Sequence, residues 1–226
     1  MKKKTTNIIL LVILLIIGGF AIYYFMPKKD STTTDPMAAV FKFEPMKELE
    51  DFERQKYAEL FNNAIAYTQS YPDQMDGWMT LGMVQKQIGN YQAAETAWLH
   101  VNEIRPLNST SFGNLADLYA NFLKEYDKAE AMYRRAIENS MSEAKNTSFY
   151  RNFFYFYKDY VKDETKAEQI LLEGIENNSK SDLLALAGSF YQEKGNNEKA
   201  IEYYQKYLEV NPDNEAVKKE LDTLTK

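Results

Sequence analysis

The stretch that decides the fold is residues 78–106, WMTLGMVQKQIGNYQAAETAWLHVNEIRP. Its regularly placed residues are a tryptophan, a leucine with a glycine, an alanine, a second tryptophan and a proline, namely Trp78, Leu81, Gly82, Ala94, Trp98 and Pro106. A spacing of this length that returns along a chain indicates a repeat architecture, in which each unit is one supersecondary element. Whether it returns therefore decides how the chain folds.

The spacing returns three times after residue 106. The first anchors of the four units are Trp78, Phe112, Tyr150 and Leu184, at intervals of 34, 38 and 34 residues. The longer interval places an insertion at residues 140–147. Small residues in each unit would let paired helices approach, and the aromatic residues would fill the space between successive pairs. Most tyrosines and phenylalanines are therefore assigned to packing rather than to a cofactor.

These units resemble the tetratricopeptide repeat, whose pattern is W-x2-L-G…A-x3-F…P, over residues 75–214. The resemblance implies an all-α solenoid of about four helix-turn-helix repeats, with residues 89–91 as the turn inside the first. Gln85 departs from the pattern by replacing an aromatic residue, and Phe154 by replacing a small one. The proline that ends a repeat is missing after repeats two and three, at Met141 and Ser179. Those two repeats are therefore expected to pack differently.

Helices are expected on both sides of the repeats, because such an array needs polar ends. Residues 45–72 are predicted to form an N-terminal helix or half-repeat, since Pro72 lies 34 residues before Pro106. Residues 215–226 are predicted to form a capping helix, because their apolar residues recur at helical spacing among charged ones.

An apolar run without charges occupies residues 8–26, long enough as a helix to cover the roughly 30 Å hydrocarbon core of a membrane. Residues 1–26 are therefore predicted to be a short basic N-terminus and a single transmembrane anchor. The anchor residues singled out are Ile8, Leu11, Leu15, Phe20, Tyr23 and Tyr24. The lysines at 2–4 favour a cytoplasmic N-terminus, with the repeats on the periplasmic or cell-surface side. Residues 27–44, which include three consecutive threonines, are predicted to be a flexible linker.

A cleaved signal peptide is the rival interpretation of the same run. Gly19 and Ala21 offer small residues at the two positions that a signal peptidase reads. Against cleavage, the apolar stretch continues without a break through Met26. An uncleaved anchor is therefore the preferred interpretation.

Composition removes several classes of function. The chain has no cysteine and one histidine, His100, which excludes thiolate sites and any metal site that needs two imidazoles. Beyond the three initial lysines there are 24 basic and 33 acidic residues, a net of −9, which argues against nucleic acid as a ligand. No phosphate-binding or nucleophile motif is present. The sequence therefore predicts neither an enzyme nor a cofactor, a metal or a small-molecule substrate. An acidic stretch at residues 48–53 is interpreted as a solvated face.

The resemblance implies a concave groove, lined by the first helix of each repeat, that binds a peptide segment or a helix of another protein. The matching positions are Met79, Met83, Lys86, Gln87, Asp117, Asn121, Arg151, Tyr155, Lys158 and Gln192. The predicted function is a membrane-tethered adaptor that recruits or assembles envelope proteins. A holdase-like chaperone for translocated or unassembled chains is the alternative, because thioethers and an aromatic side chain on the groove suit varied partners.

Overall fold

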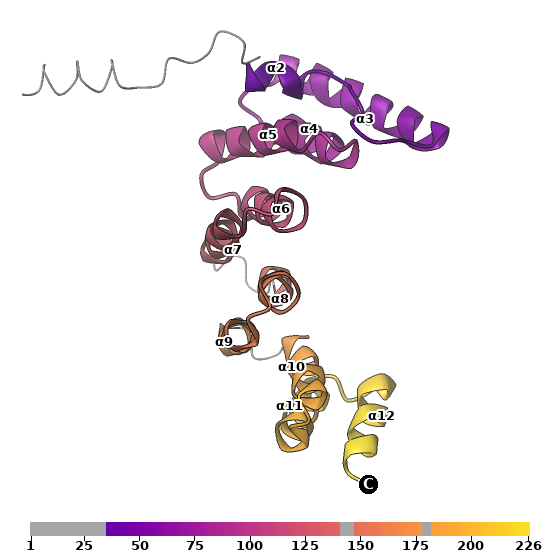
Figure 1. Ribbon diagram of the computed structural model, residues 1–226, viewed down its shortest axis with the longest axis vertical. Coiled ribbons are helices and arrows are strands. Elements are labelled where there is room, and N and C mark those ends of the chain that lie inside the picture. The colour runs from indigo at the N-terminus through magenta and orange to yellow at the C-terminus, as the bar shows by residue number, and fades with distance from the viewer. Residues whose placement is uncertain (1–34, 141–146, 178–181) are drawn as a thin grey trace, which may run out of the picture. The chain divides into compact units, whose positions relative to one another are not determined.

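Pairs of helices joined by tight turns make up most of the computed structural model, which describes residues 35–140, 147–177 and 182–226 (Figure 1). All the repeats belong to one compact unit, residues 37–226. The helices outside the repeats are α2 (Pro36–Val40), α3 (Asp51–Ser70) and α12 (Glu215–Leu224). Within the described ranges every regular element is helical, which confirms the prediction of an all-α solenoid.

Each predicted unit forms one helix pair. Repeat 1 is α4 (Met75–Gln87) with α5 (Tyr91–Ile104), and repeat 4 is α10 (Leu183–Glu193) with α11 (Asn197–Val210). Repeat 2 is α6 (Ser109–Leu118), η1 (Tyr119–Leu123) and α7 (Tyr126–Ser140). Repeat 3 is α8 (Ser148–Tyr155), η2 (Phe156–Val161) and α9 (Glu164–Asn177). The insertion expected at residues 140–147 lies almost entirely outside the described residues.

Small residues let the two helices of a pair approach, as the sequence predicted. A Cβ on Gly82 of α4 would overlap the indole ring of Trp98 on α5, and Gly188 of α10 stands in the same relation to Tyr204 on α11. The Trp98 side chain also donates a hydrogen bond to the backbone oxygen of Met79 at 3.3 Å. In each of these two helix pairs, one large aromatic ring therefore lies directly on one glycine.

Repeats 2 and 3 differ from repeats 1 and 4 by one extra residue in the first helix. The distance along the chain from the small-residue position to the next alanine is 12 residues from Gly82 to Ala94 but 13 from Ala116 to Ala129. The extra residue is absorbed as a π-helical turn, η1 in repeat 2 and η2 in repeat 3. A π turn adds one residue per turn without shifting the packed face of the helix that precedes it.

The π turns end on residues in the left-handed conformation. Lys124 has φ 59° and Lys162 has φ 63°, whereas the equivalent turns of repeats 1 and 4 use Gly89 and Gly195. Glycine adopts such a φ without steric cost, but a lysine has a Cβ that crowds its own carbonyl. Two of the four turns therefore carry a side chain at a position where the other two have none.

Phe154, which takes the place of a small residue, fits because repeats 3 and 4 meet differently at that point. Its side chain is fully buried and packs edge-on against Phe190 of α10, with ring centroids 5.4 Å apart. The expected difference in packing is therefore an aromatic contact between first helices.

A flexible linker was expected over residues 27–44, of which residues 27–34 lie outside the described residues, and residues 35–44 differ from that expectation. Residues 36–40 form the short helix α2, and Val40 is fully buried. The buried Gln85 side chain explains this, because the two N–H groups of its amide are shared among the backbone oxygens of Ala39, Val40 and Lys42, which lie at 3.2, 2.8 and 2.9 Å from the amide nitrogen. The residue that departs from the repeat pattern therefore anchors the segment before the repeats.

The N-terminal helix α3 begins at Asp51, later than the start predicted for residues 45–72. Glu50 caps it, with Glu53 completing a capping box, and the preceding chain is held by a hydrogen bond from the Met46 amide to the Ile88 oxygen at 2.8 Å. At the other end, Val217, Leu221 and Leu224 of α12 are half-buried, and none of the residues of this helix is fully buried. Among the described residues no helix combines the length and apolar character that crossing a membrane requires. The predicted anchor, residues 1–26, lies outside them.

Candidate protein-binding surface

The residues predicted to line a groove lie on the first helices of the four repeats. Met79 and Met83 lie on α4 and are half-buried, because each packs partly against the hydrophobic core. Tyr155, at the end of α8, keeps 38% of its surface exposed. These three side chains give the first-helix face an apolar component in repeats 1 and 3.

The charged residues of this face pair with one another across repeats 1 and 2. Lys86 on α4 forms an ion pair with Asp117 on α6 at 2.9 Å, and Asn121 donates to the other oxygen of the same carboxylate. The ammonium also lies 5.6 Å from the centre of the Phe122 ring. Gln87 accepts a hydrogen bond from Tyr57 of α3 at 3.5 Å. Lys86, Asp117 and Asn121 are thus brought together as one connected set, whereas Gln87 contacts α3.

The same arrangement continues across repeats 3 and 4. Arg151 on α8 lies 3.3 Å from Asp182, and Lys158 in η2 forms an ion pair with Glu193 on α10. Hydrogen bonding to Glu193 raises the pKa of Lys158 above its usual value. Gln192 donates to Glu220 of α12 at 3.2 Å. Every basic residue predicted on this face is therefore paired with a carboxylate of the same chain.

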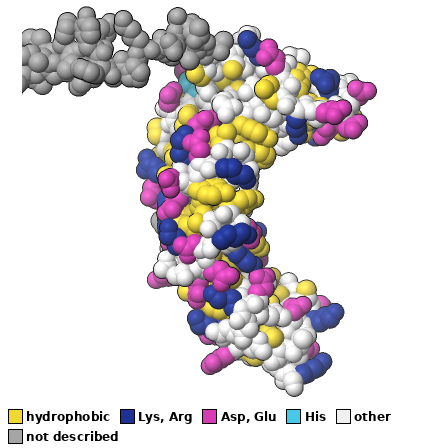
Figure 2. Space-filling model, viewed as in Figure 1, with side chains coloured by type: hydrophobic (Ala, Val, Ile, Leu, Met, Phe, Trp, Pro, Cys, Tyr) yellow, Lys and Arg dark blue, Asp and Glu magenta, His cyan; other side chains and the backbone are white. Residues whose placement is uncertain are grey.

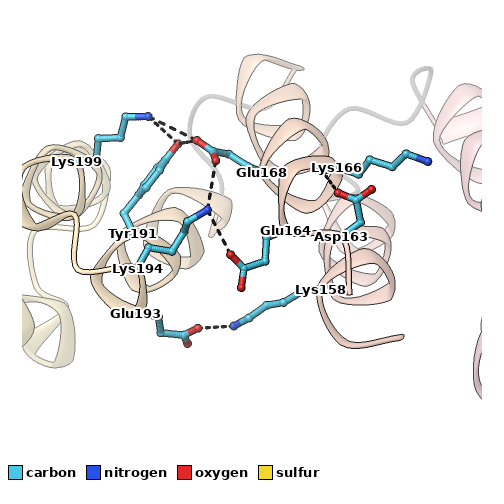
Figure 3. Close-up of polar contacts among 9 residues, drawn as sticks. All are labelled: Lys158, Asp163, Glu164, Lys166, Glu168, Tyr191, Glu193, Lys194 and Lys199. Atoms are coloured by element: carbon cyan, nitrogen blue, oxygen red, sulfur yellow. Dashed lines mark hydrogen bonds and ion pairs between the residues drawn. The ribbon is translucent and has the colours of Figure 1, made fainter. Parts of the chain in front are cut away.

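A second set of polar contacts, which sequence reasoning missed, joins successive repeats (Figure 3). At the junction of repeats 3 and 4, Tyr191 donates to Glu168 at 2.7 Å. Lys199 lies 3.5 Å from the same carboxylate and 4.5 Å from the centre of the Tyr191 ring. The hydrogen bond from Tyr191 lowers the pKa of Glu168, with Lys199 and Lys194 acting in the same direction. We call this combination a junction triad.

The other two junctions have equivalent triads. Their members are Glu95, Tyr119 and Lys128 between repeats 1 and 2, and Glu130, Tyr157 and Lys166 between repeats 2 and 3. Burial, followed by the hydrogen bond to glutamate, raises the pKa of all three tyrosines above the usual range. Each glutamate belongs to one repeat, and its tyrosine and lysine belong to the next.

The signal for the triads was present in the sequence. A glutamate directly follows the second-helix alanine of the repeat pattern in repeats 1 to 3, whereas repeat 4 has Ile201 there. A lysine directly precedes that alanine in repeats 2 to 4, whereas repeat 1 has Ala93. The glutamate that accepts is therefore missing in the last of the four repeats, and the lysine that donates is missing in the first. A comparison of the units position by position finds this pattern, but anchor residues alone do not.

Some of the exposed apolar side chains lie at the turns of repeats 2 and 3. Phe122 is 40% exposed, Tyr160 is 38% exposed, and Val161 follows Tyr160 on the same turn. Figure 2 shows hydrophobic side chains gathered in patches between lysine and arginine side chains on the face in view. These residues escaped the sequence analysis because their exposure depends on the π turns.

His100 has a packing role. Its ring lies 4.3 Å from the Trp78 ring, and its Nδ1 is 3.0 Å from Glu103 on the same helix. In the part of the chain that the structure describes, no three side chains with metal-binding groups come together.

Comparisons with known proteins identify the type of repeat. Residues 109–140 and 181–214 match the sequence model of the family described as tetratricopeptide repeat. The crystal structure of MamA is similar over 73% of this chain and 97% of its own, with 17% sequence identity and a TM-score of 0.51. No curated protein matches the sequence.

Two further solved structures are similar at lower scores. A thermophilic tetratricopeptide protein of Thermus thermophilus has 13% identity and a TM-score of 0.46, over 77% of this chain and 95% of its own. YrrB, described as a tetratricopeptide protein with an unusual peptide-binding site, has 14% identity and a TM-score of 0.43, over 68% and 95%. The matched segments are repeats 2 and 4, and repeats 1 and 3 share their helix-turn-helix construction. Two segments of this chain therefore match the tetratricopeptide repeat, and the described residues form an all-helical solenoid whose fold is similar to that of MamA.

Proposed function

We propose that this chain is a membrane-tethered adaptor that holds a segment of another protein on its first-helix face. The observation that carries the proposal is the pairing of charges on that face. Asp117 neutralises Lys86, and Glu193 neutralises Lys158. Tyr155, which lies between the two lysines in the sequence, stays exposed. A face of this kind favours a partner that presents apolar side chains rather than a charged chain terminus.

Two features of the face support recognition of a protein segment over a small molecule. It extends through the first helices of four repeats, so a bound segment would meet several helices in succession. Its apolar members lie in two repeats, Met79 and Met83 in repeat 1 and Tyr155 in repeat 3, and provide separate contacts. Large aromatic side chains and adaptable thioethers are the usual anchors of protein interfaces.

A photo-crosslinking residue at Tyr155 of the full chain, in its native membrane, tests the groove. Gln169 is a matched control, because it is exposed on the second helix of the same repeat. We expect one discrete adduct from Tyr155 that is absent from Gln169. Equal adducts from both positions would contradict a groove on the first-helix face.

The holdase alternative predicts a different result in the same experiment. The two methionines of α4 would accommodate many apolar segments, because thioether side chains adapt to irregular surfaces. A chaperone would then give a series of unrelated adducts from Tyr155 rather than one. That outcome would replace the adaptor by a chaperone while keeping the binding face.

The membrane tether is proposed on the uncharged run at residues 8–26 and on the lysines that precede it. We place the N-terminus in the cytoplasm and the repeats on the opposite side of the membrane. Membranes washed with alkaline carbonate should retain the full-length chain. Release of a shortened protein that begins near Ile22 into the soluble fraction would instead establish a cleaved signal peptide.

A further inference from the structure

The turns of repeats 2 and 3 form an exposed surface that borders the first-helix face, since the Lys86 ammonium lies 5.6 Å from the centre of the Phe122 ring. We call residues 122–124 and 160–162 the basic turns, because each has an aromatic residue, an aliphatic residue and a lysine in that order. The two turns are adjacent, since the Lys124 ammonium lies 5.2 Å from the centre of the Tyr160 ring. They therefore act as one surface rather than two separate ones.

The lysines of the basic turns are available to a partner. Lys124 contacts only the Ala120 oxygen, at 3.5 Å, and the Tyr160 ring among the described residues. The acidic residues that follow the two lysines are engaged elsewhere, Glu125 with Lys128 at 2.5 Å and Asp163 with the Lys166 amide at 2.9 Å. Each lysine also keeps a left-handed backbone that glycine would adopt without cost, and such strain is common at functional positions.

The same chain carries a surface of complementary chemistry, residues 44–53, which we call the acidic segment. It contains five carboxylates and one lysine, and it exposes 72% of Met46 and 74% of Phe52. Apolar side chains this exposed, among carboxylates, match a surface of aromatic residues and lysines in both charge and hydrophobicity. None of the carboxylates at Glu48, Asp51 or Glu44 forms an ion pair with a described residue.

The acidic segment lies at the turn of repeat 1, the position equivalent to the basic turns. The Met46 amide is bonded to the Ile88 oxygen at 2.8 Å, and a Cβ on Gly89 would lie 3.5 Å from side-chain atoms of both Met46 and Lys47. This attachment holds the segment at repeat 1, so it does not cover the turns of repeats 2 and 3 of its own chain. Equivalent turns of stacked repeats lie along one edge.

We infer that two copies of this chain associate along this turn edge, with the acidic segment of each copy on the basic turns of the other. Because both surfaces lie on one edge, a single two-fold axis satisfies both contacts at once and closes the assembly as a dimer. Phe52 and Met46 of one copy then cover the aromatic residues of the basic turns of its partner. This inference concerns the turns rather than the first-helix face around Tyr155, and it does not depend on the proposed function.

Charge reversal in two differently tagged full-length copies, expressed together, tests the dimer by co-purification. The double change Lys124→Glu with Lys162→Glu should reduce co-purification at least about tenfold, because attractive pairs become repulsive in both contacts. Glu48→Lys with Asp51→Lys should reduce it similarly. Lys219→Glu with Lys226→Glu, which alters the net charge by the same amount at exposed positions of the C-terminal end, should have no effect.

Mixing the two defective copies provides the decisive result. A chain with reversed turns and a chain with a reversed acidic segment are complementary in both contacts, so their co-purification should return to the original level. A photo-crosslinking residue at Phe122 should be joined to residues 44–53 of the second copy. Failure of the mixed pair to recover, or adducts at Phe122 with lipid or with another protein instead, would overturn the inference. Either failure leaves the result at Tyr155 unaffected, so the two proposals are tested separately.

Discussion

Gly82 shows how one residue sets the distance between two helices. Its missing side chain is replaced by the indole ring of Trp98, which is buried between α4 and α5. Gly82→Ala should therefore lower the free energy of unfolding by about 1–3 kcal/mol, the usual cost of overpacking a core. Urea denaturation measures this change. Ala131→Leu, which adds apolar atoms at an exposed position of α7, should have little effect. Equal stability of the two variants would contradict the packing described.

Gln85 has a different role at the same scale. Its amide is buried and holds three backbone oxygens of the segment that precedes the repeats. Gln85→Leu keeps the volume but leaves those acceptors unpaired, at a cost of about 1–3 kcal/mol. Hydrogen exchange should become faster at residues 36–44 and stay unchanged in repeats 3 and 4. Unchanged exchange at residues 36–44 would show that packing of Val40 alone holds this segment.

At the scale of elements, the π turns explain how repeats of unequal length stack. Deleting Val161 together with Lys162→Gly gives repeat 3 the spacing and the turn residue of repeats 1 and 4. We expect this variant to keep its helical content and to change the free energy of unfolding by less than about 2 kcal/mol, because the extra residue is confined to the turn. Circular dichroism and urea denaturation measure both quantities.

The matched control is deletion of Ala131, which also removes one residue but lies inside α7. That deletion rotates the rest of the helix by about 100°, since an α-helix has 3.6 residues per turn, and turns Tyr133 and Ala136 away from the core. It should therefore unfold repeat 2. If the two deletions lower the free energy of unfolding by the same amount, the extra residue of the π turn cannot be removed without disturbing the rest of the repeat.

At the scale of the whole molecule, the junction triads couple each repeat to the next. The pKa of Glu168 is lowered in the folded state, so its carboxylate stabilises the fold above its ordinary pKa of 4.5. That contribution is lost as the pH falls through the lowered value. Glu168→Gln should therefore be less stable than the natural chain at pH 7, and the difference should shrink as the pH falls below about 4.

Thermal denaturation across this pH range measures the contribution. Glu202→Gln is the control, because Glu202 pairs with Lys206 on the surface of a single helix and such pairs contribute little. If the difference in melting temperature between Glu168→Gln and the natural chain instead stays constant with pH, that result would show that the triad stabilises the fold through packing rather than charge.

The triads also specify where the array ends. Repeat 4 lacks the glutamate and repeat 1 lacks the tyrosine and lysine, so neither end offers a triad to a further repeat. The capping helix α12 and the segment held by Gln85 occupy those ends instead. The order of repeats is thus determined by side chains that act only between neighbours.

Much of this organisation follows from the sequence alone. The spacing of Trp78, Gly82 and Ala94 determined the helix pairs and their number, because the contacts between two helices of one repeat join residues close along the chain. The ten groove positions were implied by the resemblance to the tetratricopeptide repeat, and the structure places them in the first helices of the repeats. Their role in binding stays a prediction.

Only the tertiary structure decided which polar side chains meet between repeats. Gln85 reaches an oxygen 45 residues earlier in the chain, and Lys86 pairs with Asp117 one repeat later. The exposure of Phe122 and Tyr160 depends on π turns that a one-residue difference in spacing creates. These outcomes depend on how stacked helices are rotated and separated, which local periodicity does not specify. The sequence therefore determined the repeats, and the packing between them determined the surfaces.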